Sequence, residues 1–174
     1  RAKYDIPFIG IEPAIKPAAI QSKTNCIGIL ATKGTLNSEL FHKSVTNHPD
    51  VKIIEQIGHG LVQLIENGDI NSPEMIELLE SYLLPMVEKN IDYLVLGCSH
   101  YPYLIPQIKK IIPSNIKIID SGEAVAKQTK RILEENNILN NSIEIATQTF
   151  YTNSDPTVLE NILENKEKVF YKNF

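Results

Sequence analysis

Three consecutive residues, Cys98, Ser99 and His100, bring together the side chains in this sequence that are best suited to chemistry: a thiol, a hydroxyl and an imidazole. They follow Gly97, and Pro102 comes two residues after them. A thiolate is a strong nucleophile and proton acceptor, and imidazole changes its charge near neutral pH. The pattern therefore indicates acid–base or nucleophilic chemistry centred on Cys98.

The position of this cluster in the chain strengthens that interpretation. Residues 93–96 form an apolar run that predicts a buried strand, and residues 102–112 carry apolar side chains at helical spacing. Open α/β sheets bind their ligands at the carboxyl ends of the strands, which is where Cys98 would lie. The start of the following helix would also favour a thiolate.

Each residue of the cluster also has a structural interpretation. A single buried cysteine such as Cys98 is usually a small apolar residue of the core. His100 is either a base, a proton shuttle or a substrate contact, or else a loop histidine that bonds the backbone. Ser99 either binds a carboxylate at the helix start or caps the helix that Pro102 opens. The residues alone leave these alternatives open.

Other polar residues are explained without a function. Cys26 opens the apolar strand predicted at 26–31 and is assigned to the core. Residues 120–122 (Asp-Ser-Gly) repeat the strand-end pattern, which a capping side chain explains. His59 and Glu66 belong to a predicted helix, where most such residues are ordinary surface residues.

Composition limits the class of protein. The 174 residues are 43% hydrophobic and 22% charged, and the net charge is −4 with no basic block. This length allows one domain, or one domain and part of another, and the charge argues against nucleic acid as the main partner. No apolar run approaches the ~20 residues of a membrane span. Two distant cysteines, without CxxC or HExxH spacing, predict a reduced cytoplasmic thiol protein without a metal site.

Strands and helices alternate along the chain, which predicts an α/β fold with a parallel sheet and helices on both faces. We expect a turn at residues 32–35 and a kink or boundary at Pro85. Strands are predicted at 6–11, 26–31, 51–55, 93–96, 116–119 and 143–150, and helices at 15–20, 37–47, 58–66, 73–90, 102–112, 123–135 and 157–165.

Residues 94–102 (LVLGCSHYP) resemble the second active-site motif of the glutamate racemases, members of the aspartate/glutamate racemase superfamily. Residues 9–13, 27–35, 61–66 and 118–122 also resemble segments of that family, in the same order. The likeness covers nearly the whole chain.

The resemblance implies a two-domain α/β enzyme with its site between the domains. Residues 7–120 would form a flavodoxin-like second domain, and residues 121–174 would return to complete the first domain. The family interconverts L- and D-glutamate for peptidoglycan without cofactor or metal, by means of two cysteines on opposite faces of the substrate. Cys98 would be the base that acts on L-glutamate.

The resemblance also implies roles for the neighbours of Cys98. His100 would assist Cys98, and Ser99 and His100 would contact the substrate. Glu66 matches an acid with a supporting role.

The family's opening segments have no counterpart here, including the Cys-Asn-Thr motif that carries the first base. Cys26 does not replace that base, because its surroundings match a different segment. Gly58 and His59 stand where many members have Cys-Pro, and the chain begins without Met. We therefore expect half of an enzyme, inactive without the missing N-terminal half, with association into a homo-oligomer through uncovered apolar faces.

Two other functions are compatible with the same residues. One is a hydrolase or transferase with a cysteine nucleophile, which would need a base on Cys98 and an oxyanion site. The other is a non-catalytic α/β module that binds carboxylates without exchange of a substrate proton. Ester turnover and proton exchange at Cα distinguish the three functions.

Overall fold

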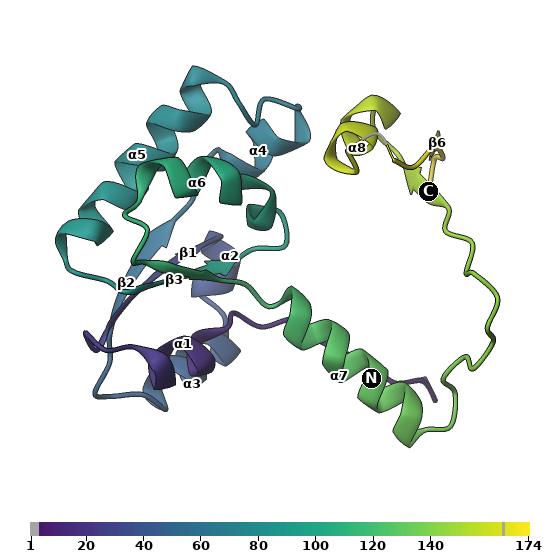
Figure 1. Ribbon diagram of the computed structural model, residues 1–174, viewed down its shortest axis with the longest axis horizontal. Coiled ribbons are helices and arrows are strands. Elements are labelled where there is room, and N and C mark those ends of the chain that lie inside the picture. The colour runs from purple at the N-terminus through teal and green to yellow at the C-terminus, as the bar shows by residue number, and fades with distance from the viewer. Residues whose placement is uncertain (1–3, 165) are drawn as a thin grey trace.

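The computed structural model describes residues 4–164 and 166–174, and it has the predicted α/β architecture (Figure 1). The elements follow one another as α1 (Ile15–Gln21), β1 (Cys26–Ala31), α2 (Lys33–Leu36), α3 (Glu39–Thr46), β2 (Lys52–Ile57), α4 (Leu61–Glu66), α5 (Pro73–Glu88), β3 (Tyr93–Gly97), η1 (Tyr101–Leu104), α6 (Ile105–Ile111), β4 (Lys117–Ile119), α7 (Gly122–Glu135), β5 (Phe150–Thr152), α8 (Pro156–Ile162) and β6 (Val169–Tyr171).

A four-stranded parallel sheet in the order β2-β1-β3-β4 forms the centre of the molecule. Every residue of β1 and β3 is buried, which explains why both strands are continuous apolar runs in the sequence. The order matches the first four strands of the flavodoxin-like arrangement, in which the chain reverses its winding between β1 and β3. Ligands of such folds bind at that switch point, beyond the carboxyl ends of these two strands.

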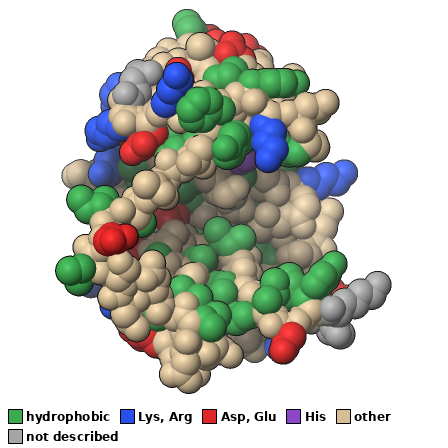
Figure 2. Space-filling view, turned by 90° about the vertical axis from the view of Figure 1, so that its right-hand side faces the viewer, with side chains coloured by type: hydrophobic (Ala, Val, Ile, Leu, Met, Phe, Trp, Pro, Cys, Tyr) green, Lys and Arg blue, Asp and Glu red, His purple; other side chains and the backbone are tan. Residues whose placement is uncertain are grey.

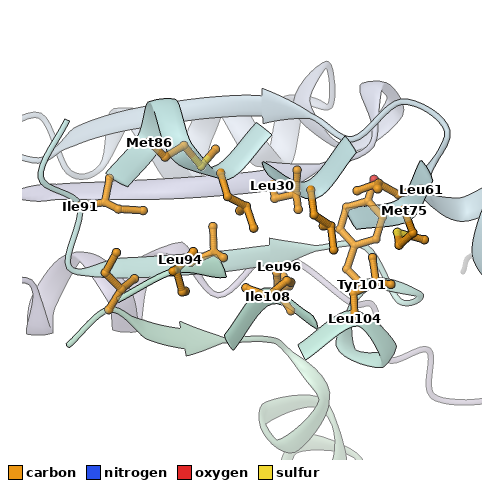
Figure 3. Close-up of a cluster of buried hydrophobic side chains, with 14 of the residues drawn as sticks. Leu30, Leu61, Met75, Met86, Ile91, Leu94, Leu96, Tyr101, Leu104 and Ile108 are labelled. Carbon is orange, nitrogen blue, oxygen red and sulfur yellow. The ribbon is translucent and has the colours of Figure 1, made fainter. Parts of the chain in front are cut away.

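Helices cover both faces of the sheet, as predicted. On one face α4, α5, η1 and α6 pack over a core that includes Leu30, Met75 and Leu94 (Figure 3). On the other face α1 and α3 contribute Ile15 and Phe41 to a second core. The apolar stripes of these helices thus supply most of the burial that fixes the sheet.

The structure differs from the sequence predictions at residues 32–35 and rules out a helix boundary at Pro85. Residues 32–35 form the start of helix α2 rather than a simple turn, because the Thr32 hydroxyl accepts a hydrogen bond from the N–H of Thr35 at 3.2 Å. Helix α5 has no boundary at Pro85 and continues to Glu88. Pro85 is exposed, so water can satisfy the carbonyl that its missing N–H leaves free.

The C-terminal third lies apart from the four-stranded sheet (Figure 1). Helix α7 contains no buried residue, and residues 138–149 form neither helix nor strand. After this stretch, β5 and β6 form a separate two-stranded parallel sheet joined through α8. This C-terminal unit, residues 150–171, is a single strand–helix–strand crossover.

Two predicted strands are wrong, and the predicted end of the last helix changes. Residues 6–11 and 143–149 are not strands, because no neighbouring strand pairs with their backbone groups. Ile143 and Ile145 are 102% and 96% exposed. The last helix, predicted to residue 165, ends at Ile162, while Asn165 lies outside the described residues. Strand β6 was not predicted.

Candidate active site

Cys98 follows directly after β3, at the carboxyl edge of the sheet and at the switch point between β1 and β3. Gly97 pairs with Ala31 at the end of the ladder, and a Cβ atom on Gly97 would lie 2.7 Å from the Ala31 Cβ. Glycine therefore permits the close approach of the two strands. Because Ala31 and Gly97 lie so close, the next residues, Thr32 and Cys98, both lie at the carboxyl edge of the sheet.

Cys98, His100 and Glu66 form a connected series of side chains. The half-buried Cys98 Sγ lies 3.9 Å from His100 Nδ1 and accepts a hydrogen bond from the His100 N–H at 3.5 Å. On the other side of the ring, His100 Nε2 lies 3.1 Å from Glu66 Oε1. Glu66 is the last residue of α4, 34 positions earlier in the chain. The structure thus brings together a thiol, an imidazole and a carboxylate.

Ser99 also contacts the imidazole, since its Oγ lies 3.5 Å from His100 Nδ1. Ser99 is exposed and makes no side-chain cap to a helix. His100 contacts side chains rather than a backbone carbonyl. Of the structural alternatives, helix capping by Ser99 and backbone bonding by the His100 ring are thus absent from the described contacts.

Burial raises the pKa of the Cys98 thiol above its ordinary value. Hydrogen bonds from the backbone N–H groups of His100 and Tyr101 lower the pKa, and the negative charge of Glu66 raises it further. This corrects the expectation that a helix start would favour the thiolate. Cys98 is followed by a single 3₁₀ turn, η1, and the α-helix begins only at Ile105.

A cavity with a volume of about 500 Å³ opens beside Cys98, within the range of sites for small ligands. Most of its polar lining comes from the segments that follow three strands: Thr32 and Thr35 after β1, Cys98 and Ser99 after β3, and Asp120 and Ser121 after β4. Glu12, from the segment before α1, also lines it. Sequence reasoning did not select Thr32 or Thr35. Their position directly after a buried strand was the available signal.

A second cavity of about 420 Å³ lies on the other side of His100. Glu66, Ser99 and His100 line it together with residues 152–155 of the C-terminal unit. Figure 2 shows the molecule hollowed on this side, between the C-terminal unit above and α7 below. Ser99 lines both cavities.

The remaining sequence candidates lie elsewhere or have structural roles. Cys26 is buried in the core, as predicted, and its Sγ donates to the Lys89 carbonyl at 3.4 Å. His59 is exposed and lies in the turn before α4 rather than on the predicted helix. Its carbonyl accepts a hydrogen bond from the Tyr82 hydroxyl. Asp120 accepts a hydrogen bond at 2.6 Å from the N–H of Gly122, the first residue of α7, whereas Ser121 at the N-cap position makes no side-chain cap.

Within residues 4–164 and 166–174, no group of three or more His, Cys, Asp and Glu side chains is placed to hold a metal ion. In the same part of the chain, no helix has the length and apolarity needed to cross a membrane.

The parallel α/β fold with a thiol at the switch point is that of a thiol-containing α/β protein, and sequence comparison shows its family. Residues 1–129 match the family described as Asp/Glu/Hydantoin racemase, and the chain belongs to this family. Its relatives include glutamate racemases. The chain is 42% identical over 165 residues to that of Pseudomonas entomophila, a match that covers 94% of this chain and 62% of the relative. It is 44% identical over 161 residues to that of Ralstonia pickettii, covering 92% and 57%.

Solved structures give the same result. The glutamate racemase of Escherichia coli, in complex with L-glutamate and the activator UDP-MurNAc-Ala, superposes with a TM-score of 0.81 at 26% identity. An isoform from Bacillus anthracis gives 0.79 at 28% identity. These alignments cover 99% of this chain, and 66% and 67% of the two structures. The chain therefore spans between 57% and 67% of the length of these four proteins.

Proposed function

We propose that this chain supplies one half of a cofactor-independent glutamate racemase. The contact series Cys98–His100–Glu66 at the switch point carries the proposal, because it places an acid–base group beside a cavity of suitable size. Membership of the racemase family supports the reaction class. The related structures from E. coli and Francisella tularensis were solved with L-glutamate and D-glutamate, respectively, which supports the choice of substrate.

In the proposed reaction, the Cys98 thiolate accepts the α-proton of L-glutamate, and the electron pair of the broken C–H bond remains on Cα. A second acid on the opposite face then donates a proton to Cα and gives D-glutamate. A thiol whose pKa is raised becomes a stronger base once it has lost its proton. His100 lies where its ring can take that proton from Sγ, and Glu66 then faces the positive ring.

The first cavity is lined by hydroxyl groups, which can bind the carboxylates of glutamate, and by Glu12 and Asp120, whose carboxylates suit only its ammonium group. Thr32, Thr35 and Ser99 line the cavity together with Cys98. Hydroxyl groups donate hydrogen bonds to carboxylates, and such charge-assisted bonds are strong. We assign substrate binding to Ser99 and His100, and add Thr32 and Thr35.

The proposal includes two domains, residues 7–120 and residues 121–174. The first range holds the four-stranded sheet and both cores. In the second range, α7 buries no residue, and the two-stranded parallel sheet leaves Tyr151, Phe170 and Tyr171 between 44% and 62% exposed. Parallel sheets are normally covered on both faces. An N-terminal portion of the enzyme would cover these residues and supply the second acid.

A racemase of this kind would work in the cytoplasm and supply D-glutamate to the cell. Both cysteines are free, and a thiol base has to stay reduced, which favours the cytoplasm. The D-glutamate would serve peptidoglycan synthesis. In the absence of the N-terminal portion, the uncovered apolar side chains favour association of the chain into a homo-oligomer.

The test is NMR in heavy water with the chain alone, and with the chain joined to the N-terminal portion of the P. entomophila enzyme. We expect D-glutamate only from the joined protein. The Cys98→Ala variant should abolish its formation while Cys26→Ala retains it. Normal turnover by Cys98→Ala, or D-glutamate at enzymatic rates from the 174-residue chain alone, would contradict the proposal. An ester-hydrolysis burst would favour the hydrolase instead, and carboxylate binding without exchange the binding module.

A further inference from the structure

We propose that Tyr101 is a positioning residue whose hydroxyl, with that of Tyr82 beside it, holds Glu66 against His100 and Cys98. Its importance for catalysis rests on the function proposed above. The Tyr101 side chain is fully buried, and its hydroxyl donates to the Gly58 carbonyl at 3.1 Å. This bond joins the turn after β3 to the loop before α4, across 43 positions of the chain.

The Gly58 end of this bond controls where α4 begins. The Gly58 N–H donates to the Ala31 carbonyl at 3.0 Å, which extends the pairing of β1 with β2. Helix α4 starts at Leu61 and is only six residues long, so Glu66 at its end lies within two turns of the loop. The Tyr82 hydroxyl, from α5, donates to the next carbonyl, that of His59, at 2.9 Å. Two tyrosines thus hold two consecutive peptide groups.

The Tyr101 end of the bond controls the thiol. The N–H of Tyr101 donates to the Cys98 carbonyl at 3.2 Å and closes the turn that carries Ser99 and His100. Tyr101 therefore belongs to the same rigid turn as the thiol and the imidazole. A shift of this turn relative to α4 would change the 3.1 Å contact between His100 and Glu66 directly.

The ring and the hydroxyl of Tyr101 have separable roles. Figure 3 shows the ring packed beside Leu61 and Leu104, within the core between the helices and the sheet. A Cβ atom on Gly58 would lie 2.4 Å from the Tyr101 hydroxyl and 2.8 Å from Leu61, so the loop fits closely around the oxygen. Burial raises the pKa of Tyr101, which keeps the hydroxyl protonated as a donor. Phenylalanine would fill the core but leave the Gly58 carbonyl unpaired.

The experiment measures the rate of Cys98 alkylation by iodoacetamide against pH, in the 174-residue chain, for Tyr101→Phe, Glu66→Gln and the double variant. Glu66→Gln should raise the rate at neutral pH several-fold, because the Glu66 charge raises the pKa of Cys98. Tyr101→Phe should shift the profile in the same direction, since a looser turn buries the thiol less and moves Glu66 away. In the Tyr101→Phe background, Glu66→Gln should then add little.

Tyr93→Phe is the matched control. Tyr93 is also buried and lies at the start of β3, away from the site. Its hydroxyl donates to Gln21 Oε1 at 3.3 Å and accepts from Lys117 Nζ at 3.2 Å. This variant should leave the Cys98 profile and the Glu66→Gln effect unchanged, although it loses a hydroxyl of the same kind.

The proposal would be overturned if Glu66→Gln raised the rate of Cys98 alkylation as much in the Tyr101→Phe protein as in the wild type. If Tyr101→Phe does not fold, Tyr82→Phe decides, because it removes only a solvent-accessible hydroxyl on α5 that bonds the same loop at the His59 carbonyl. A smaller shift in the same direction would support the proposal, and an unchanged profile would overturn it. The readout is the thiol and not glutamate turnover, so the result holds even if the racemase assignment fails.

Discussion

Cys98 combines features that act on its acidity in opposite directions. Burial and the charge of Glu66 favour the neutral thiol, whereas two backbone N–H groups favour the thiolate. Burial is the largest of these effects, so the pKa of the Cys98 thiol is raised and the neutral thiol is favoured at neutral pH. In the proposed reaction, His100 next to Sγ is the group that takes the thiol proton.

The first prediction follows from this raised pKa. Cys98 should alkylate with a midpoint above the ~8.5 of a free cysteine, because the thiolate is the reactive form and forms only at higher pH. The rate at pH 7 should therefore be lower than that of a model thiol. Mass spectrometry of the Cys26→Ala protein treated with iodoacetamide would measure the alkylation rate of Cys98 alone. A midpoint at or below that of the model thiol would mean that the backbone N–H groups outweigh burial.

At the scale of elements, the site depends on how closely β1 and β3 approach at their carboxyl ends. Ala31 and Gly97 form the last pair of this ladder, and the next residues line the cavity. A Cβ atom at position 97 would collide with the Cβ of Ala31, which is fixed to the backbone and cannot rotate away. Any larger residue must separate the two strands.

We therefore predict that Gly97→Ala destabilises the protein by about 1–3 kcal/mol, as overpacking does, and alters the alkylation of Cys98. Urea unfolding measures the first effect. Gly34→Ala is the control, since a Cβ there would meet only the Thr32 hydroxyl at 4.0 Å and the residue lies in helix α2. Equal stability of Gly97→Ala and wild type would show that the strands separate at no cost.

Sequence patterns predicted correctly the strands whose burial depends only on their own apolar residues. The strands around Ile29 and Val95 were correct because a continuous apolar run is buried wherever it lies. The strand expected at 143–150 failed because alternating residues form a strand only beside a partner. Of the site, Cys98 was evident from its own surroundings. Glu66 emerged only from the family resemblance, and the Tyr101–Gly58 bond joins distant positions without a local signal.

At the scale of the whole molecule, the chain consists of a well-packed α/β unit and a C-terminal third with little burial. Residues 138–149 connect the two parts without secondary structure. The exposed Ile143 and Ile145 in this connection are apolar residues without contacts that would order them. Cooperative stability therefore resides in the residues around the four-stranded sheet.

We predict that proteinase K cleaves first within residues 138–149 and leaves a stable fragment that ends near residue 137. The loop between α4 and α5 is the internal control. It is also exposed, but the Asp69 N–H donates to the Leu64 carbonyl of α4 at 2.8 Å, and the Ser72 N–H donates to the Asp69 carbonyl at 3.0 Å. Initial cleavage in that loop, detected by intact mass, would contradict this account. Joining the N-terminal portion should slow cleavage of residues 138–149.

Because β1 lies inside the sheet, it stays partly unpaired while the ribosome makes the rest of the chain. β1 pairs on one side with β2 and on the other with β3, which the ribosome makes on the order of 70 residues later. At roughly 5–20 residues per second, the apolar strand waits about 4–14 s for its second neighbour. During this interval an unpaired edge of Ile27, Ile29 and Leu30 is open to other chains, so a nascent-chain chaperone would have its strongest effect before Tyr93 emerges.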